Sequence, residues 1–158
     1  MEESKINSNQ FISVSLILAE QACKIIREIH NEGVFSTKFK VGDDPVTKAD
    51  FTAQWIVETG LKKAFPGIKI IGEEGSNGIP SEFDFNNFDL NKFDDFGFEK
   101  RDYNLDDCCV FIDPLDGTRN YIKGELYAVS CLITLACNKI PVAAIIAKPF
   151  EGHAQDET

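Results

Sequence analysis

Two stretches of helical periodicity precede the β-type patterns in this chain, and that order narrows the folds it can adopt. Over residues 8–32, apolar side chains recur every three or four positions, and Gly33 follows as a helix stop. A second stretch with the same period runs over Val46–Ala64 and is closed by Pro66 and Gly67. We therefore expect two amphipathic helices at the start of the domain.

Short runs rich in β-branched residues follow the helical part. They are Ile68–Ile71, Val110–Ile112, Ala128–Ala136 and Val142–Ala147. A turn at Asn138 and Lys139 joins the last two runs, which predicts an antiparallel pair. Two helices followed by such strands predict an α+β fold, with both helices packed on a mostly antiparallel sheet.

One segment interrupts this pattern. Ser76–Asp107 is rich in Asp, Asn and Phe, and it holds six of the thirteen phenylalanines of the chain. That many aromatic side chains are not typical of a flexible linker. We expect residues 1–158 to form one domain that carries residues 76–107 as an insertion loop.

The charge balance excludes one class of partner. Of 158 residues, 16 are Lys or Arg and 26 are Asp or Glu, which gives a net charge of -10 at pH 7. A chain this acidic has no basic stripe with which to displace counterions from a nucleic-acid polymer. A small polyanionic substrate remains compatible with this charge, provided that bound metal ions reverse its sign locally.

No segment suggests a membrane or a secretory route. The longest apolar stretch, near Val14–Leu18, is far too short to span a bilayer. The start of the chain, Met1-Glu2-Glu3, is acidic, whereas a secretory leader begins with positive charge. We therefore expect a cytoplasmic protein that does not bind membranes.

The cysteines and histidines do not form a recognisable site. The five cysteines are Cys23, Cys108, Cys109, Cys131 and Cys137. They contain no CxxC pair, and three lie in apolar surroundings, which favours free, buried thiols. His30 and His153 are too few and too far apart for a metal site built on imidazole. We therefore expect the cysteines to be reduced.

Three acidic clusters lie at the ends of predicted elements. Asp50 lies at the opening of the second helix, and Glu73 and Glu74 follow the first strand. Asp113 and Asp116 follow the second strand, three residues apart. Carboxylates just past strand ends can converge on one edge of a sheet and offer Mg²⁺ the oxygen ligands it prefers. The spacing of Asp113 and Asp116 would let them bridge two ions.

The residues Asp116, Gly117 and Thr118 have a second use. If a helix begins there, its free backbone N–H groups and its dipole favour a phosphate. Gly117 lets the backbone approach the oxyanion, and the Thr118 hydroxyl can position a water. One short segment would then supply metal ligands and phosphate donors together.

Each cluster also has a purely structural explanation. Thr47 and Asp50 match a helix capping box. Glu73 and Glu74, between glycines, could be a solvated turn, and Asp116 could cap a helix. The metal and phosphate interpretation is favoured, because the structural interpretation would have to hold independently for all three clusters.

Three motifs together resemble the inositol monophosphatase superfamily. They are Asp113–Thr118 (DPLDGT), Ile71–Glu74 (IGEE) and Pro45–Asp50 (PVTKAD). The superfamily includes inositol monophosphatases, inositol polyphosphate 1-phosphatases, fructose-1,6-bisphosphatases and bisphosphate nucleotidases. The resemblance covers Phe11–Pro149. It implies that the chain is the N-terminal part of a layered α/β/α/β/α sugar-phosphatase fold.

The resemblance implies a set of metal ligands. Glu73, Asp113, Asp116 and the backbone carbonyl of Leu115 would bind magnesium, with two or three ions in the complete enzyme. Glu74 would contact these ligands without binding the metal itself, or would bind a third, more weakly held ion. Inhibition by lithium is implied as well.

The resemblance also implies catalytic and phosphate-binding residues. Asp50 and Thr118 would orient and activate the attacking water, and Gly117 and Thr118 would hold the scissile phosphate. No covalent phospho-enzyme is expected, because Asp113 is occupied as a ligand and no cysteine lies in a CxxxxxR loop.

The branch of the family is indicated by the residues after the third motif. Arg119–Val129 (RNYIKGELYAV) and Pro45–Gly75 resemble the phosphatases that convert 3'-phosphoadenosine 5'-phosphate to AMP. The pair Asn120 and Tyr121 also resembles inositol monophosphatases. The implied substrate is a small phosphorylated nucleotide, with inositol phosphate as the alternative.

Members of this branch are about twice as long as this chain. Their second half carries a Trp-Asp-x-Ala segment whose Asp completes the second metal site, whereas the single tryptophan here, Trp55, precedes Ile56. We expect the chain either to need a missing C-terminal half or to be a shortened relative. A non-catalytic fragment that binds Mg²⁺ and phosphate is the remaining alternative.

Overall fold

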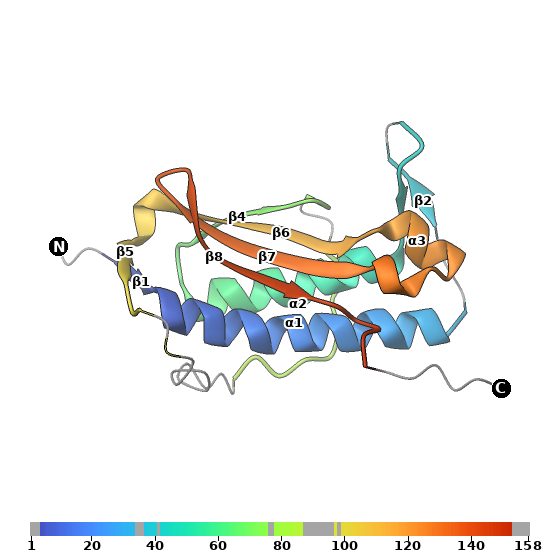
Figure 1. Ribbon diagram of the computed structural model, residues 1–158, viewed down its shortest axis with the longest axis horizontal. Coiled ribbons are helices and arrows are strands. Elements are labelled where there is room, and N and C mark those ends of the chain that lie inside the picture. Colours follow the sequence, from blue (N-terminus) through green and yellow to red (C-terminus); the bar gives the residue numbers. More distant parts are fainter. Residues whose placement is uncertain are drawn as a thin grey trace.

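A four-stranded sheet carries the two long helices of the molecule on one of its faces (Figure 1). The computed structural model describes residues 4–33, 37–40, 42–75, 78–86, 97 and 99–152. The sheet has the order β4 (Lys69–Gly72), β6 (Cys108–Asp116), β7 (Ser130–Cys137) and β8 (Ile140–Ala147). Only β4 and β6 are parallel; the other neighbours are antiparallel. The predicted α+β fold with a mostly antiparallel sheet is confirmed.

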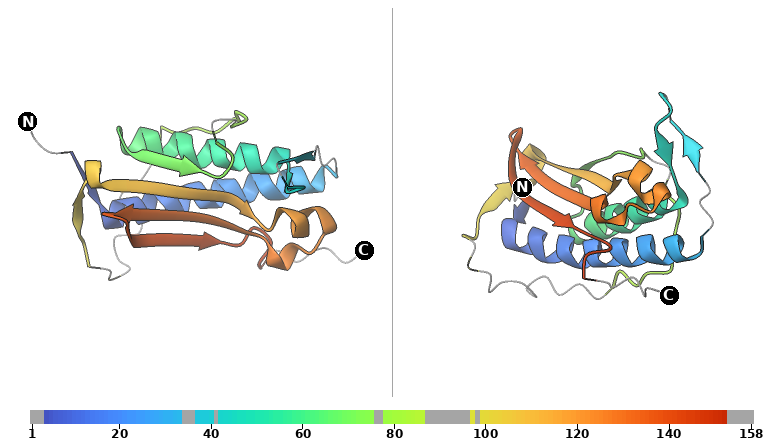
Figure 2. Two further views of the ribbon diagram at one scale, coloured as in Figure 1. Left: turned by 90° about the horizontal axis from the view of Figure 1, so that it is seen from above. Right: turned by 45° about the vertical axis from the view of Figure 1, so that its right-hand side comes forward.

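The helices α1 (Ser8–Asn31) and α2 (Lys48–Ala64) begin at side-chain caps. The Asn7 side chain accepts from two backbone N–H groups of the first turn of α1. Both helices lie against the same face of the sheet, side by side (Figure 2). The second helix starts two residues later than predicted, because β3 (Pro45–Val46) pairs with β2 (Lys38–Phe39) in a small hairpin.

A second pair of short strands lies near the N-terminus. β1 (Lys5–Asn7) pairs antiparallel with β5 (Asp102–Asn104), and the 3-10 turn η2 (Leu105–Asp107) leads from β5 into β6. The predicted insertion therefore includes some regular structure at its end. Phe85 packs edge-on against Phe83 and against Trp55 of α2. Residues 76, 77, 87–96 and 98 of the insertion lie outside the described residues.

The core lies between the helices and the sheet face that they cover. Alternate residues of the strands point into it and are at most 6% exposed: Val110, Ile112, Ile133, Leu135 and Ile145. The turn between β7 and β8 has positive φ at both central residues, 51° at Asn138 and 67° at Lys139. That geometry matches the right-handed twist of a two-residue hairpin, which explains the predicted turn.

The structure corrects the expectation that every cysteine is a free thiol. Cys108 and Cys137 face each other across β6 and β7 with their Cα atoms 4.3 Å apart, and they form a disulfide. They are 29 residues apart in the chain, so strand register, which the sequence pattern does not report, brings them together. Cys23 and Cys131 are free and buried, as expected, and Cys109 is free and half-buried.

Two short helical segments follow β6. α3 (Thr118–Lys123) and η3 (Leu126–Ala128) return the chain to β7. The acidic start at residues 1–3 and His153 lie outside the described residues. Within the described ranges, none of the helices combines the length and apolar character that crossing a bilayer requires.

Candidate active site

The parallel strands β4 and β6 bring the predicted carboxylates to one edge of the sheet. The chain leaves β4 at Glu73, whose backbone N–H donates to the Ile112 carbonyl at 3.0 Å. Glu73 therefore lies beside Asp113 of β6. The ladder between β6 and β7 shifts register between Asp113 and Asp116, and this irregularity places both carboxylates at the same end of β6.

A hollow of about 260 Å³ lies at this end of the sheet. It is lined by Asp44, Glu73, Asp113, Leu115, Asp116, Gly117, Thr118, Arg119 and Asn120. Larger hollows lie elsewhere, beside Tyr127 and Phe150, between α1 and β8, and beside Tyr103 and Val142. The smaller hollow is the one that collects the predicted metal and phosphate residues.

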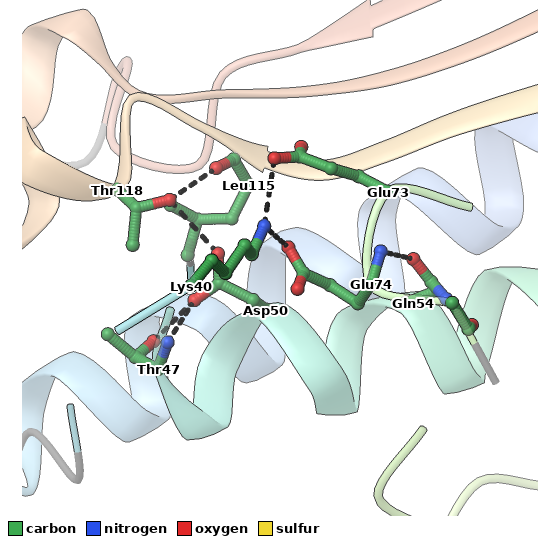
Figure 3. A network of polar contacts seen from close by, with 9 residues as sticks. Lys40, Thr47, Asp50, Gln54, Glu73, Glu74, Leu115 and Thr118 are labelled. Atoms are coloured by element: carbon green, nitrogen blue, oxygen red, sulfur yellow. Dashed lines mark hydrogen bonds and ion pairs between the residues drawn. The ribbon is translucent and has the colours of Figure 1, made fainter. Parts of the chain in front are cut away.

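Asp50 and Thr118 meet across 68 residues of chain (Figure 3). The Thr118 hydroxyl lies 3.0 Å from Asp50 Oδ1 and 3.1 Å from the Leu115 carbonyl oxygen, and its single proton serves one acceptor at a time. Asp50 Oδ2 accepts from the Thr47 backbone N–H at 2.8 Å and from the Thr47 hydroxyl at 2.6 Å. The capping box is therefore present, and it leaves Oδ1 of Asp50 for Thr118.

Gly117 is required by the backbone at this position. Its φ is 88°, in the left-handed region, and a Cβ there would lie 2.9 Å from the Ala128 carbonyl oxygen. α3 begins immediately after it, at Thr118, so the helix start on which the phosphate interpretation depends is present. The Ser130 hydroxyl, on β7, donates to Asp116 Oδ2 at 3.3 Å.

A lysine that the sequence analysis did not single out lies inside the acidic cluster. The Lys40 ammonium, from the β2–β3 hairpin, is 2.9 Å from Glu73 Oε1 and 2.7 Å from Glu74 Oε1 (Figure 3). The Arg119 guanidinium donates to the Asp43 carbonyl of the same hairpin. Two cationic side chains thus hold the hairpin against the candidate site.

Asp113 and Glu73 have opposite electrostatic environments. Burial, together with the hydrogen bond and charge of Glu73 and the charge of Asp116, raises the pKa of Asp113 to about 7. Burial also acts to raise the pKa of Glu73, but hydrogen bonds from Lys40 and Asp113 and the charge of Lys40 outweigh it and lower this pKa. Asp113 Oδ1 is buried without a hydrogen-bond partner. An unpaired buried carboxylate oxygen is rare and is typical of a site that takes a cation.

Burial has the largest effect on the pKa of each of the other two carboxylates, Asp50 and Glu74. It raises the pKa of Asp50, against hydrogen bonds from Thr47 and Thr118 that lower it. It also raises the pKa of Glu74, which is 6% exposed, against the hydrogen bond and charge of Lys40. A carboxylate with a raised pKa is a stronger base, so Asp50 is well suited to attract the Thr118 proton.

The donor atoms lining the hollow are of the type that binds a hard cation, although they are not assembled into a metal site. In the part of the chain that the structure describes, no three His, Cys, Asp or Glu side chains lie close enough together to hold a metal ion. The oxygens gathered here are nevertheless those that Mg²⁺ prefers, namely carboxylates of Glu73, Asp113 and Asp116 and the Leu115 carbonyl. The unpaired Asp113 Oδ1 points to the same conclusion. The metal assignment stays a prediction that these residues fit.

Gln54 is a second residue that the sequence analysis did not single out. It is fully buried on α2, one helical turn after Asp50, and it hydrogen-bonds to the turn that carries Glu74 (Figure 3). A signal for it exists in the sequence, because Gln54 falls on the apolar face of a predicted amphipathic helix. A polar residue at such a position is buried only with partners.

Comparison with solved structures defines the class of fold. The extragenic suppressor protein SuhB from Bartonella henselae superposes with a TM-score of 0.66 and 24% sequence identity. The superposition covers 88% of this chain and 45% of that chain. The likeness shows that this chain adopts the layered α+β fold of that protein.

The family follows from the sequence comparisons. The model of the inositol monophosphatase family matches residues 7–156, so the chain belongs to that family. It is 34% identical to 3'(2'),5'-bisphosphate nucleotidase 1 of Dictyostelium discoideum, over 97% of this chain and 50% of the relative. It is 26% identical to inositol monophosphatase 3 of Xenopus tropicalis, over 95% of this chain and 44% of the relative. The chain therefore spans about half the length of the curated relatives it matches.

Proposed function

We propose that the protein is a Mg²⁺-dependent phosphomonoesterase that removes the 3'-phosphate of 3'-phosphoadenosine 5'-phosphate. The observation that carries the proposal is the contact of the Thr118 hydroxyl with Asp50 beside the buried, unpaired oxygen of Asp113. A polarised hydroxyl next to a cluster of hard oxygen donors suits the attack of water on a phosphate. In this reaction water adds to phosphorus, and the 3'-oxygen leaves with a proton, which gives AMP and phosphate.

The chain's own residues would activate the water. When the Thr118 hydroxyl donates to Asp50 Oδ1, 3.0 Å away, its lone pairs are free to accept a proton from a water. Asp50 would draw the Thr118 proton toward itself, and Thr118 would draw a proton from the water. The Thr47 contacts hold Asp50 Oδ2 and keep the carboxylate from rotating away.

Glu73, Asp113, Asp116 and the Leu115 carbonyl would hold the magnesium, with two or three ions in the complete enzyme. When bound there, Mg²⁺ supplies positive charge that offsets the charge of the phosphate as its ester bond breaks. Gly117 and Thr118 would hold the phosphate at the start of α3, and glycine is needed at 117 because its φ of 88° is in the left-handed region. Lithium inhibition is part of the same proposal.

The nucleotide substrate is supported by the relative with 34% identity, which is a bisphosphate nucleotidase. The test is a comparison of kcat/KM for 3'-phosphoadenosine 5'-phosphate and for inositol 1-phosphate. The proposal expects clear preference for the nucleotide. The opposite preference would indicate that the substrate is an inositol phosphate. This is the second candidate, because the chain is also similar to a relative named inositol monophosphatase 3.

The metal assignment has its own test. Asp113→Asn is expected to abolish activity while leaving the fold intact, because it removes a charged ligand without changing the shape of the side chain. Asp106→Asn, in η2 just before the start of β6 and so at the opposite end of that strand from Asp113, is the matched control and should retain full activity. Turnover by Asp113→Asn at limiting Mg²⁺ equal to that of the unaltered protein would refute the assignment.

Residues 1–158 by themselves carry only part of the proposed site. We propose that they bind one Mg²⁺ weakly, turn over little substrate and require a further half as partner, because the chain spans about half the length of its relatives. Calorimetry with Mg²⁺ on this chain checks the proposal. Two tight sites with normal turnover would contradict it, whereas binding of Mg²⁺ and phosphate without turnover in the complete protein would favour a non-catalytic module.

A further inference from the structure

The side-chain amide of Gln54 joins α2 to the turn that carries both glutamates. Its Nε2 donates to the Gly75 carbonyl at 2.6 Å, and its Oε1 accepts from the Glu74 backbone N–H at 2.9 Å. These partners define the orientation of the amide, because an N–H can only donate and a carbonyl can only accept. Gln54 is fully buried, and its hydrogen bond to the Glu74 N–H is shielded from water, whereas the one to the exposed Gly75 is partly buried.

Gly72 provides the space for this amide. A Cβ on Gly72 would lie 2.4 Å from Cδ, 2.5 Å from Oε1 and 2.6 Å from Nε2 of Gln54. The side chain of Gln54 therefore packs directly on the last residue of β4. The following turn is held on its other side by β6, through the Glu73 N–H and the Ile112 carbonyl.

The same helix positions Asp50. Asp50 and Gln54 are four residues apart on α2 and both are buried, at 1% and 0% exposure. One rigid helix therefore fixes the Asp50 carboxylate that contacts Thr118, and also the backbone from which Glu73 and Glu74 project. A change in the Gln54 contacts would move the glutamates relative to Asp50.

We propose that Gln54 is a positioning residue, which sets the geometry of the divalent-cation site through the backbone of Glu74 and Gly75. The inference rests on the proposed function, because it assigns Glu73 to a cation site. Gln54 itself is not among the residues proposed to bind substrate or metal. Residues that orient metal ligands from behind typically change metal affinity about 10–100-fold when they are altered.

The first test is Gln54→Met in the complete protein. Methionine keeps the length and volume of glutamine but can replace neither hydrogen bond. The Glu74 amide proton should exchange with solvent faster, and the affinity for Mg²⁺ should fall about 10-fold or more. Amide hydrogen exchange and calorimetry with Mg²⁺ alone measure these two effects without any substrate.

A second variant reaches the same contact from the opposite side. Gly72→Ala should displace the amide and reproduce both effects. Gly60→Ala is the matched control, because its Cβ would lie 2.3 Å from Leu18 Cδ2, between α1 and α2 and away from the site. It should lower the melting temperature and leave the Mg²⁺ affinity and the Glu74 exchange rate unchanged. In a chain that carries Gln54→Ala, Gly72→Ala should have little further effect on Mg²⁺ affinity, because the clashing amide is then absent.

The outcomes separate this inference from the proposed function. Weaker Mg²⁺ binding in both Gln54→Met and Gly72→Ala, but not in Gly60→Ala, supports a positioning residue. Unchanged Mg²⁺ affinity in Gln54→Met overturns it and leaves Gln54 as core packing. Gln54-dependent Mg²⁺ binding in a protein that hydrolyses no phosphomonoester would support the inference and refute the proposed function. Absence of Mg²⁺ binding in the unaltered protein would overturn both.

Discussion

The two faces of the four-stranded sheet are both apolar, but the described residues cover only one of them. Ile145 and Ile146 are neighbours on β8, yet Ile145 faces the helices and is 6% exposed, while Ile146 faces outward and is 70% exposed. The outer face continues across the sheet, where Phe111 lies beside Ile71 in the parallel ladder. Both of these side chains are largely exposed.

The contrast between the two faces indicates what kind of sheet the chain builds. A sheet with one solvated face normally alternates apolar and polar residues, whereas near-continuous apolar strands are typical of sheets covered on both sides. No helix among the described residues lies over the outer face (Figure 1). An exposed apolar surface of this kind is typical of an interaction site. We therefore expect the two faces to respond differently to modification and substitution.

The largest difference is expected in thiol reactivity. Cys131 is fully buried on the covered face, whereas Cys109 is half-buried on the outer face. Cys131 can react only after the protein unfolds. Its alkylation should therefore be slower than that of Cys109 by a factor on the order of several thousand, which corresponds to an unfolding free energy of about 5 kcal/mol. Mass spectrometry after timed alkylation of the native chain measures both rates. Equal rates would show that the covered face opens freely.

The same experiment tests the disulfide. Cys108 and Cys137 should remain unmodified after denaturation without reductant and should both react after reduction. Five reactive thiols in the unreduced, denatured chain would restore the interpretation that the sequence suggested.

The next largest effect is expected from Ile145→Ala. The substitution leaves a cavity between β8 and α1, so the free energy of unfolding should fall by roughly 2–4 kcal/mol. Urea denaturation followed by circular dichroism checks this value. A loss near zero would mean that the edge strand contributes little to the core.

A smaller effect is expected on self-association of residues 1–158. The chain should associate through its outer face, and Phe111→Thr should weaken that association about 10-fold or more. Burial of an aromatic side chain contributes at least about 1.4 kcal/mol, which corresponds to a factor of ten in the association constant. Analytical ultracentrifugation over a concentration series measures the effect. Lys69→Thr, on the same face of the sheet, serves as the control for a polar side chain.

The smallest effect is expected from Ile146→Ala, the matched partner of Ile145→Ala. Since Ile146 is largely exposed, its truncation should change the free energy of unfolding by no more than about 0.5 kcal/mol. Equal losses of unfolding free energy in Ile145→Ala and Ile146→Ala would show that the two faces do not differ in burial. That result would show that the outer face is already covered in solution.

Local patterns in the sequence determined most of the elements. The period of three to four residues located both long helices within two residues of their ends, because that period reports which side of a helix is apolar. The Thr47–Asp50 spacing predicted the cap that forms, and Asn138 and Lys139 predicted a turn that needs positive φ. The motifs ending at Glu74 and Thr118 contain carboxylates that line the hollow, while their role as metal ligands stays a prediction.

Contacts between distant segments were decided by the tertiary structure alone. Lys40 reaches Glu73 across 33 residues of chain, Gln54 reaches the turn at Gly75 across 21, and Cys108 pairs with Cys137 across 29. A local pattern shows which face of an element is apolar, but it does not show which residue lies opposite. Strand register and helix placement decide that, and both depend on how the whole core packs.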